Sequence, residues 1–274
     1  MITRTLTGAC LVAVLALVLT YSGNPIFLNT VIAVVSAASV FELYRAAGML
    51  KYKWLYPVSC CLILVGAFLP SALWVTMVFF AAGVLCAFAM MHKVGVAHAV
   101  PAWQAGVMAA CILEFFKTMS GIRGMDHGLL ILICAISVPV LNDVFAYLVG
   151  SRIGHHHLAP KLSPHKSIEG SVAGLSVGTL TLLLVAWRLD KTLYCRVDFV
   201  LLTCYLVSAS VIGQFGDLAF SAVKRLAGVK DYGKLLPGHG GLLDRFDSAL
   251  YTIPFTYIFF SLYPATISLA GVAG

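Results

Sequence analysis

Charged residues are scarce in this 274-residue sequence, where Asp, Glu, Lys and Arg fill only 11% of the positions. Soluble domains have about 25%, so a soluble globular fold is disfavoured. Long apolar stretches recur along the whole chain instead, with 61% hydrophobic residues and a mean hydropathy of +0.96. A transmembrane helix takes about 20 apolar residues, so the chain has room for roughly eight to ten of them. No length is left for a separate soluble domain.

The sequence also lacks CxxC pairs, strand-like alternation of any length, low-complexity tracts and obvious repeats. Most of its eight cysteines lie in apolar stretches, where Cys behaves as a small hydrophobe. We therefore expect neither a disulfide framework nor a zinc site.

Acidic residues are fewer than basic ones, which gives a formal net charge of +7. No basic run is interleaved with aromatic residues in a soluble stretch, so we expect no nucleic-acid partner. Membrane proteins keep Lys and Arg in cytoplasmic loops, where these residues face anionic lipid headgroups. Membrane lipid is therefore the expected partner of the basic excess.

The apolar stretches predict an all-α, polytopic membrane protein with about nine transmembrane helices. The segment after Arg4 could pass for a signal peptide, but no clear small-residue cleavage site follows before Asn24, so we interpret it as a retained first helix. We divide the chain into N-terminal helices at 1–125 and a C-terminal transmembrane region at 126–274. The predicted spans are 6–21, 26–47, 54–70, 71–91, 103–119, 128–149, 168–187, 197–219 and 249–272.

The basic residues predict the orientation of these helices. With the N-terminus in the cytosol, thirteen of the eighteen Lys and Arg residues fall in inside segments and five in outside loops. The positive-inside rule favours this arrangement. It places two polar loops, 150–167 and 220–248, together on the cytosolic side.

The segment from Asp217 to Asp247 holds four of the eleven acidic residues and five of the eighteen basic ones. If the eighth helix continues past the membrane face, a carboxylate, a hydroxyl and two cations share one side of it, because their spacing is i, i+4, i+7, i+8. An acidic residue at the end of an apolar span is costly unless it is paired or binds a metal. A simple Asp–Lys surface pair is the alternative interpretation. The residues of this face are Asp217, Ser221, Lys224 and Arg225.

Three glycines and one proline lie within 237–241 and require unusual backbone angles. Such a turn can aim backbone N–H groups into an anion-binding nest. Asp244 and Asp247 follow at i, i+3 near a helix start, a position that favours phosphate. Carboxylates beside a phosphate-binding turn suit Mg²⁺, which is usually held by one or two carboxylates plus substrate phosphates. An ordinary turn and an N-terminal helix acid are the alternative interpretations.

A second polar cluster begins at Asn142-Asp143, which interrupts an apolar span. A buried pair of this kind indicates a functional site by default. Lys166, in the following loop, is a candidate phosphate contact. The consecutive histidines 155–157 cannot share one helical face, so we interpret them as solvated residues rather than as a metal site.

Two other pairs of opposite charge occur near span ends, each spaced i, i+3. They are Glu42 with Arg45 and Glu114 with Lys117. We expect each pair to interact locally at the membrane interface.

Two stretches of the C-terminal half match a known pattern. The first is Ser221-Ala222-Val223-Lys224-Arg225, then Lys230-Asp231-Tyr232-Gly233, then Leu236-Pro237-Gly238-His239-Gly240-Gly241-Leu242-Leu243-Asp244-Arg245-Phe246-Asp247. The second is Asp143, Ala146-Tyr147, Gly150, Gly154, Ser163-Pro164, Lys166 and Glu169-Gly170. Together they resemble the phosphatidate cytidylyltransferases, or CDP-diacylglycerol synthases. The first 120 residues are similar only as apolar helices. His165 and Ser167 depart from the family's Ser-Pro-Lys-Lys-Thr run, which leaves the role of position 165 open.

The resemblance implies that CTP and phosphatidate react to give CDP-diacylglycerol and pyrophosphate, with Mg²⁺ as cofactor. The lipid substrate is anchored in the bilayer, which fits a membrane enzyme, and cytosolic CTP fits the predicted orientation. The resemblance also implies a homodimer in a bacterial plasma membrane. It leaves open whether a monovalent cation such as K⁺ joins Mg²⁺ at the site.

The resemblance and the turn together suggest roles for the individual residues. Asp217 and Asp244 are the expected Mg²⁺ ligands, and Asp247 belongs with them and Lys224 to the expected catalytic set. Expected contacts to nucleotide, phosphate or metal are Asp143, Lys166, Ser221, Arg225, Asp231, Gly238, His239, Gly240, Gly241 and Arg245.

Three alternatives remain beside this interpretation. A CTP-dependent polyprenol kinase has a similar substrate and setting, but the Ser-x-x-Lys-Arg to Asp-Arg-x-Asp pattern disfavours it. A transporter often has repeats with broken helices in both halves, whereas polar residues here crowd into the C-terminal half. A CDP-alcohol phosphotransferase would show an Asp-Gly…Asp…Asp spacing that is not evident.

Overall fold

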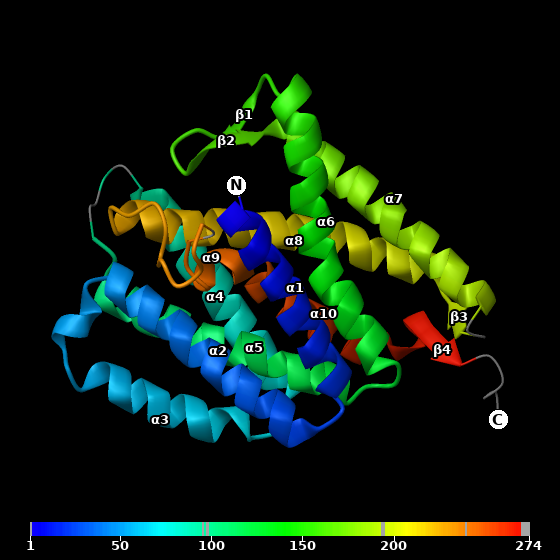
Figure 1. Ribbon diagram of the computed structural model, residues 1–274, viewed down its shortest axis with the longest axis horizontal. Coiled ribbons are helices and arrows are strands. Elements are labelled where there is room, and N and C mark those ends of the chain that lie inside the picture. The colour runs from blue at the N-terminus through cyan, green and yellow to red at the C-terminus, as the bar shows by residue number, and fades with distance from the viewer. Residues whose placement is uncertain (1, 95, 97–98, 193–194, 239, 270–274) are drawn as a thin grey trace.

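The computed structural model describes residues 2–94, 96, 99–192, 195–238 and 240–269. Over these residues the chain forms a bundle of long helices (Figure 1), so the predicted all-α membrane architecture is confirmed. The long helices are α1 (Ile2–Tyr21), α2 (Pro25–Ala46), α3 (Leu55–Ala67), α4 (Leu73–Lys93), α5 (Ala102–Arg123), α6 (Gly128–Ile153), α7 (Ile168–Thr192), α8 (Phe199–Leu226) and α10 (Ala249–Leu262). The short helices are η1 (Met49–Lys51), α9 (Leu243–Phe246) and η2 (Pro264–Thr266).

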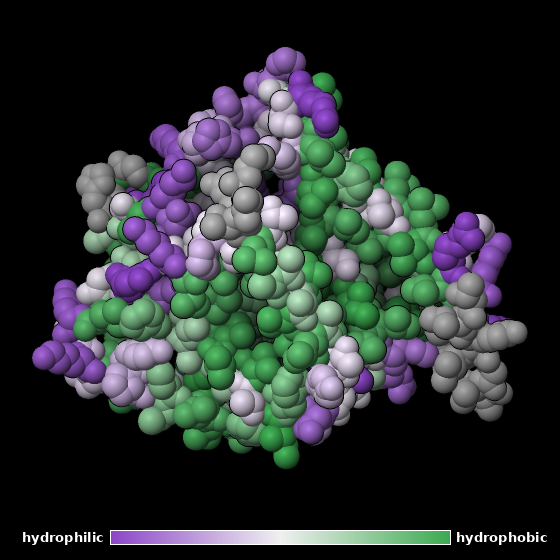
Figure 2. Space-filling view, viewed as in Figure 1, coloured by the Kyte–Doolittle hydropathy of each residue, from purple (hydrophilic) through white to green (hydrophobic). Residues whose placement is uncertain are grey.

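Length and composition qualify some of these helices as complete membrane spans. Among the described residues, α2, α4, α5, α6, α7 and α8 are long and apolar enough to cross a bilayer. The part of α1 from Thr5 to Tyr21, α3 and α10 are apolar but shorter. The predicted count of nine spans is therefore not established, although a helix lies at each predicted place. Hydrophobic residues cover the middle of the molecule in Figure 2, and hydrophilic residues lie around it, most of them at the top and along the left edge.

The last predicted span, 249–272, extends too far toward the C-terminus. α10 ends at Leu262 and is followed by η2 and a short strand. A run of apolar residues does not by itself distinguish helix from strand when it is short. Residues 263–269 form η2 and β4 beside the start of α8, where the Asp198 N–H donates to the Thr266 carbonyl at 3.0 Å.

Two antiparallel ribbons lie where the sequence predicted no strands. β1 (His157–Ala159) pairs with β2 (Ser163–Ser167), and β3 (Cys195–Val197) pairs with β4 (Ile267–Leu269). Strands of three to five residues are too short to show a clear alternating pattern. The predicted loop 150–167 thus contains the last turn of α6 and the β1–β2 ribbon. This ribbon stands at one end of the molecule, above the helices (Figure 1).

Helices α6 and α7 approach each other closely because α7 carries glycine at every fourth position, 170, 174 and 178. A Cβ atom at Gly170 would lie 2.6 Å from the Ala146 carbonyl oxygen, and one at Gly174 would lie 2.5 Å from the Asn142 carbonyl oxygen. Small residues at this spacing let membrane helices pack backbone to backbone. The close packing holds β2, which directly precedes α7, against the end of α6.

The short helix α10 is almost entirely buried and packs against α4, α5, α6 and α8. Tyr251 is fully buried, and its hydroxyl donates to the Gly83 carbonyl at 3.0 Å. On α8, a Cβ atom at Gly216 would lie 3.0 Å from the Asp247 carbonyl oxygen. Glycine at 216 therefore lets α8 lie directly on the segment that leads into α10, which brings Asp217 beside that segment.

Candidate active site

The polar residues of α8 connect two other parts of the chain. α8 continues unbroken to Leu226, so its polar face forms as the spacing predicted. Asp217 makes an ion pair with Lys166 of β2. One to two turns later, Lys224 makes an ion pair with Asp244 of α9, with 2.9 Å between Nζ and Oδ1. The ribbon and the glycine-rich segment are thus both held to the same end of α8.

The other two residues of this face differ in their surroundings. Ser221 is buried between the two ion pairs. Arg225 is exposed, and its Nε donates to the Leu162 carbonyl at 3.0 Å. Arg225 therefore connects the end of α8 to the turn of the β1–β2 ribbon.

Asp244 is buried, with 7% of its surface exposed, and both of its carboxylate oxygens are engaged. Oδ1 accepts from the Lys224 ammonium, and Oδ2 accepts from the N–H groups of Tyr232 at 2.8 Å and Gly241 at 3.0 Å. Hydrogen bonds to an ionised group are about twice as strong as neutral ones. Asp244 therefore ties both ends of the segment 232–241 to α8.

We call residues 232–243 the glycine-rich loop. Gly238 and Gly240 have φ angles of 77° and 83°, which L side chains rarely adopt, so the unusual backbone predicted for this turn is present. The Leu236 N–H donates to the Gly240 carbonyl at 2.9 Å and closes the turn. His239, predicted as a nucleotide contact, lies outside the described residues. Gly238 is exposed at the tip of the turn.

The predicted anion nest holds carboxylates of the protein itself. The Gly241 N–H donates to Asp244, and the next two N–H groups, of Leu242 and Leu243, donate to Glu42 at 3.1 and 2.8 Å. These three donors are therefore not directed at a free anion. The role predicted for Gly241, close approach to nucleotide, stays a prediction.

Glu42 of α2 is a site residue that the sequence prediction missed. We expected it to pair with Arg45, but its carboxylate is only 3% exposed and accepts from the glycine-rich loop. Arg45 instead donates to the Tyr232 carbonyl at the start of the same loop. The acidic residue in an apolar helix was the available signal. Its partners lie 200 residues away in sequence, so spacing alone does not reveal them.

The second local pair behaves as predicted. Glu114 and Lys117 of α5 form an ion pair at 3.5 Å. The pair is buried in the bundle, and the Thr76 hydroxyl donates to Glu114 at 2.8 Å. Among the described residues it forms no hydrogen bond or ion pair with the glycine-rich loop, and we take it as structural.

Asp247 is buried between α9 and α10, and its Oδ1 accepts from the Ser248 N–H at 2.8 Å. Burial raises the pKa of Asp247 above its ordinary value, and the nearby Lys224 opposes that shift in part. A carboxyl with a raised pKa inside a polar cluster is a common feature of functional sites.

Asp143 of α6 reaches the same cluster from the membrane side. Its side chain is exposed, and Lys166, Asp247 and Arg245 act on it electrostatically. Its neighbour Asn142 is buried, and its Nδ2 donates to the Ser210 carbonyl of α8 at 3.2 Å. Asn142 is therefore structural, whereas Asp143 belongs to the site. Asp231 is exposed and lies beside Gly240 at the edge of the loop.

The structure thus collects charges of both signs from α6, β2, α8 and the α9 region. Its carboxylates are Asp143, Asp217, Asp244 and Asp247, and its cations are Lys166, Lys224 and Arg245. Alternating signs stabilise such a cluster without a ligand, because each buried charge has an opposite charge nearby. The same cations are suited to bind phosphate when a substrate enters.

The donor types fit Mg²⁺, which takes oxygen ligands and relies on few carboxylates. Among the residues that the structure describes, no group of three or more His, Cys, Asp and Glu has the geometry of a metal site. In the structure, Lys166 and Lys224 lie against the two predicted ligands, Asp217 and Asp244. The Mg²⁺ site stays a prediction.

The three consecutive histidines are exposed, as predicted for solvated residues. His156 Nδ1 lies 2.6 Å from Glu169, which also accepts from the N–H groups of His155 and His156. Glu169 therefore fixes the connection between α6 and β1.

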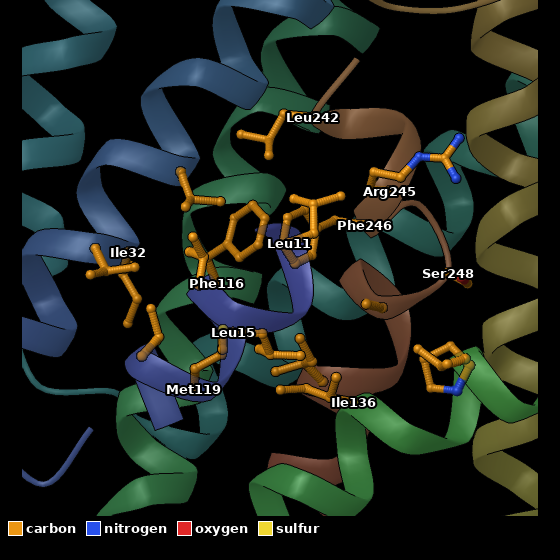
Figure 3. A pocket seen from close by; sticks show the side chains of 18 of the residues that line it. Leu11, Leu15, Ile32, Phe116, Met119, Ile136, Leu242, Arg245, Phe246 and Ser248 are labelled. Atoms are coloured by element: carbon orange, nitrogen blue, oxygen red, sulfur yellow. The ribbon is translucent and has the colours of Figure 1, made fainter. Parts of the chain in front are cut away.

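An apolar cavity of about 350 Å³ adjoins the charged cluster. Hydrophobic residues of α1, α2, α5 and α6 line most of it, including Leu11, Ile32, Phe116 and Ile136, whereas Arg245 and Ser248 lie along one side (Figure 3). Asp143 also lines it. The cavity therefore combines a long apolar wall with a charged margin, an arrangement suited to an amphipathic ligand.

The helical bundle, the charged cluster and the adjoining apolar cavity define a polytopic membrane protein with a polar site at one end of its helices. The chain belongs to the cytidylyltransferase family, whose model matches residues 2–263.

The relatives within this family bear a more specific name. The chain is 39% identical over 143 residues to a phosphatidate cytidylyltransferase of Bacillus subtilis (strain 168), a match that covers 52% of each protein. It is 40% identical over 140 residues to one of Staphylococcus aureus (strain COL), covering 51% of this chain and 50% of the relative. The matches thus span about half the length of these relatives.

Proposed function

We propose that the chain transfers the cytidylyl group of CTP to phosphatidate, giving CDP-diacylglycerol and pyrophosphate. The observation that carries the proposal is the position of the charged cluster directly beside an apolar cavity. One substrate is water-soluble and highly anionic, and the other is a phosphate on a lipid. A site that joins both environments serves this pair of substrates, and the relatives' name supports the same reaction.

The lipid substrate would bind along the cavity. Its acyl chains would lie against the apolar walls formed by α1, α2, α5 and α6, where Leu15 and Phe116 are typical lining residues. Its phosphate would then meet Arg245 at the charged margin of the cavity. Burying each CH₂ group contributes roughly 0.8 kcal/mol, so the apolar wall would supply affinity and Arg245 would supply orientation.

In the transfer step, an oxygen of the lipid phosphate attacks the α-phosphorus of CTP. A P–O bond to the lipid phosphate forms, the bond between the α-phosphorus and the bridging oxygen to the β-phosphate breaks, and pyrophosphate leaves with that bond's electron pair. The substrate brings its own nucleophile, so no enzyme residue needs to bond to phosphorus. Lys166, Lys224 and Arg245 would hold the phosphates in line and offset their charge.

The transfer requires the cations to exchange partners. Without substrate, Lys166 and Lys224 are paired with Asp217 and Asp244. Phosphate oxygens would take over the ammonium groups, which frees carboxylate oxygens at the moment when the nucleotide arrives. We propose that Asp217 and Asp244 then bind Mg²⁺, with Asp247, Asp143 and Asp231 as further ligands or nucleotide contacts. Mg²⁺ would supply neutralisation of charge on the transferring group.

The remaining predictions about the site belong to the same proposal. Ser221 and Arg225, near the ion pairs, would contact phosphate. Gly238, His239, Gly240 and Gly241 would let the loop approach the nucleotide. The N-terminus, the β1–β2 ribbon and the glycine-rich loop would face the cytosol of a bacterial cell, as the distribution of basic residues favours. A homodimer is proposed from the family resemblance.

The experiment uses purified protein in detergent with phosphatidate, Mg²⁺ and CTP labelled at either the α- or the γ-phosphate. Label from the α-phosphate in lipid is the expected result, and it should require Mg²⁺ and disappear with EDTA. Asp217→Asn should abolish it. Asp190→Asn is the matched control, because Asp190 accepts from Val197 at the β3 ribbon and lies outside the site.

Two other outcomes would reject the proposal. Label from the γ-phosphate in lipid would identify a CTP-dependent lipid kinase. If the protein is folded and neither position gives labelled lipid, this reaction is excluded and a transporter is favoured instead.

A further inference from the structure

We infer that Glu42 of α2 is a positioning residue that holds the glycine-rich loop in the conformation that binds nucleotide. The inference rests on the proposed function for the identity of the ligand, whereas the contact itself is seen directly. Glu42 belongs to the N-terminal helices, where the sequence offered no motif. Through this contact, the N-terminal half would help to form the site and would not serve only as a membrane anchor.

Glu42 and the glycine-rich loop are joined by two hydrogen bonds. Each carboxylate oxygen of Glu42 accepts one backbone N–H group, Oε1 from Leu242 at 3.1 Å and Oε2 from Leu243 at 2.8 Å. The side chain is 3% exposed. Leaving a buried carboxylate without partners costs several kcal/mol, so the loop and the carboxylate each depend on the other.

Two glycines of the loop provide the space for this carboxylate. A Cβ atom at Gly233 would overlap Oε1 of Glu42, and a Cβ atom at Gly241 would lie 2.6 Å from Oε2. Neither glycine has a positive φ angle, so backbone conformation does not require glycine at these positions. Close approach of Glu42 accounts for Gly233, and Glu42 together with the Gly233 backbone nitrogen, at 2.7 Å, accounts for Gly241.

Glu42 acts on the site through the backbone of Leu243, which it holds by a hydrogen bond. Leu243 directly precedes Asp244, whose carboxylate holds Lys224, Tyr232 and Gly241. Arg45, one turn after Glu42 on α2, holds the Tyr232 carbonyl. Helix α2 therefore fixes both ends of the loop, and Asp244 joins these ends to α8. Within the part of the chain that the structure describes, neither Glu42 nor Arg45 forms a hydrogen bond or ion pair with a charged side chain of the cluster.

A purely local role for Glu42 is the competing interpretation. Glu114 offers the matched control, since it is also a buried acid of the N-terminal half with a polar partner, Thr76, and a nearby cation. If Glu42 only stabilises the bundle, Glu42→Gln and Glu114→Gln should have similar effects. If Glu42 positions the loop, only Glu42→Gln should change the loop and the affinity for CTP.

The first measurement is limited proteolysis with trypsin in detergent. Lys230 and Lys234 are exposed and flank the start of the loop, so cleavage after them reports how firmly the loop is held. Gln keeps the length of the side chain but directs an NH₂ group at one of the two N–H donors. We expect cleavage on the order of tenfold faster in Glu42→Gln, equivalent to about 1.4 kcal/mol of lost holding energy, and wild-type rates in Glu114→Gln. Equal rates in Glu42→Gln and wild type would overturn the inference.

The second measurement is kinetic. We expect Glu42→Gln to raise KM for CTP with a smaller change in kcat, and kcat/KM to fall on the order of 10²-fold, as misplacement of a binding loop does. KM for phosphatidate should change little. A fall in kcat alone, with KM for CTP unchanged, would contradict a positioning role in nucleotide binding.

The third measurement uses the steric relation and does not depend on the reaction. Gly233→Ala should speed tryptic cleavage in the wild-type background, because its methyl group displaces the Glu42 carboxylate. In a Glu42→Ala background the carboxylate is gone and only the milder contact with Gly241 Cα, at 3.1 Å, remains, so Gly233→Ala should add much less. Additive effects would overturn the inference. If the protein turns over no CTP at all, the proposed function fails. The proteolysis of Glu42→Gln and of the Gly233→Ala variants still decides whether Glu42 holds the loop.

Discussion

The ion pair between Lys224 and Asp244 gives the most direct energetic prediction. Asp244→Asn removes the charge that Lys224 faces. Its NH₂ group, at the position of Oδ1 or of Oδ2, leaves either the Lys224 ammonium or both N–H groups, of Tyr232 and Gly241, without an acceptor. The Lys224 and Asp244 side chains are 12% and 3% exposed, so water does not replace the lost partner.

Breaking a buried pair by removing one partner costs about 3–5 kcal/mol. We expect Asp244→Asn to lower the free energy of unfolding by an amount in this range. Lys224→Met should have a similar effect, because it leaves the carboxylate unpaired. The double variant removes both charges and should lose less than the sum, with a coupling energy of roughly 2–3 kcal/mol.

The assay is unfolding in mixed micelles at increasing SDS concentration, followed by tryptophan fluorescence for wild type, both single variants and the double variant. Glu114→Gln with Lys117→Met forms a matched cycle on another buried pair. That second cycle should lower stability without changing KM for CTP. Additive effects of Lys224→Met and Asp244→Asn, within about 0.5 kcal/mol, would refute the assignment of the pair as a coupled, shielded unit.

Three further predictions concern other parts of the site. Lys166→Met should lower kcat/KM on the order of 10²–10³-fold, the usual cost of removing a charged contact from a transferring phosphate, and a loss below tenfold in the steady-state assay would exclude that role. Gly240→Ala should destabilise the protein by about 1–3 kcal/mol, because φ is 83°. Gly106→Ala, which meets nothing within 4 Å and lies in α5, should instead stabilise it by about 0.5–1 kcal/mol in thermal unfolding, because Ala favours a helix. Burial raises the pKa of Asp247 in the folded protein, so the unfolded chain loses this proton at a lower pH than the folded chain. The free energy of unfolding should therefore fall as the pH rises from the ordinary Asp pKa through the pKa of Asp247 in the folded protein. Asp247→Asn should flatten this dependence in unfolding curves measured across that range, and an unchanged slope would count against the buried carboxyl as its source.

The charged cluster was predictable to the extent that its residues are close in sequence. Asp217, Lys224 and Asp244 stood out because charge is unexpected in an apolar chain, and helical spacing correctly joined the residues of α8. Which carboxylate meets which cation was not predictable. The Lys166–Asp217 pair joins residues 51 positions apart through the packing of α6, α7 and α8, and no local pattern encodes that distance.

Glu42 is a second residue whose partners local sequence spacing did not predict. Its spacing to Arg45 suggested a local pair, yet the two residues hold different atoms of the glycine-rich loop. Local pairs on a helix contribute only a few tenths of a kcal/mol, so a buried arrangement with two charge-assisted hydrogen bonds easily replaces them. The short strands were missed for a related reason, since three to five residues carry no periodic signal.

Hydropathy by itself determined that this protein is a helical membrane bundle, because each long apolar segment must satisfy its own backbone in lipid. The arrangement of glycine, proline and charge by itself pointed to the segments that form the charged cluster, because charge is costly in an apolar chain unless it is paired or binds a ligand. Tertiary packing alone decided that the loop's N–H groups would hold Glu42 and Asp244, and that an apolar cavity would open beside Arg245. These contacts join segments up to 201 positions apart, and their geometry follows from how helices α2, α6, α8 and α10 pack, which one-dimensional patterns do not contain.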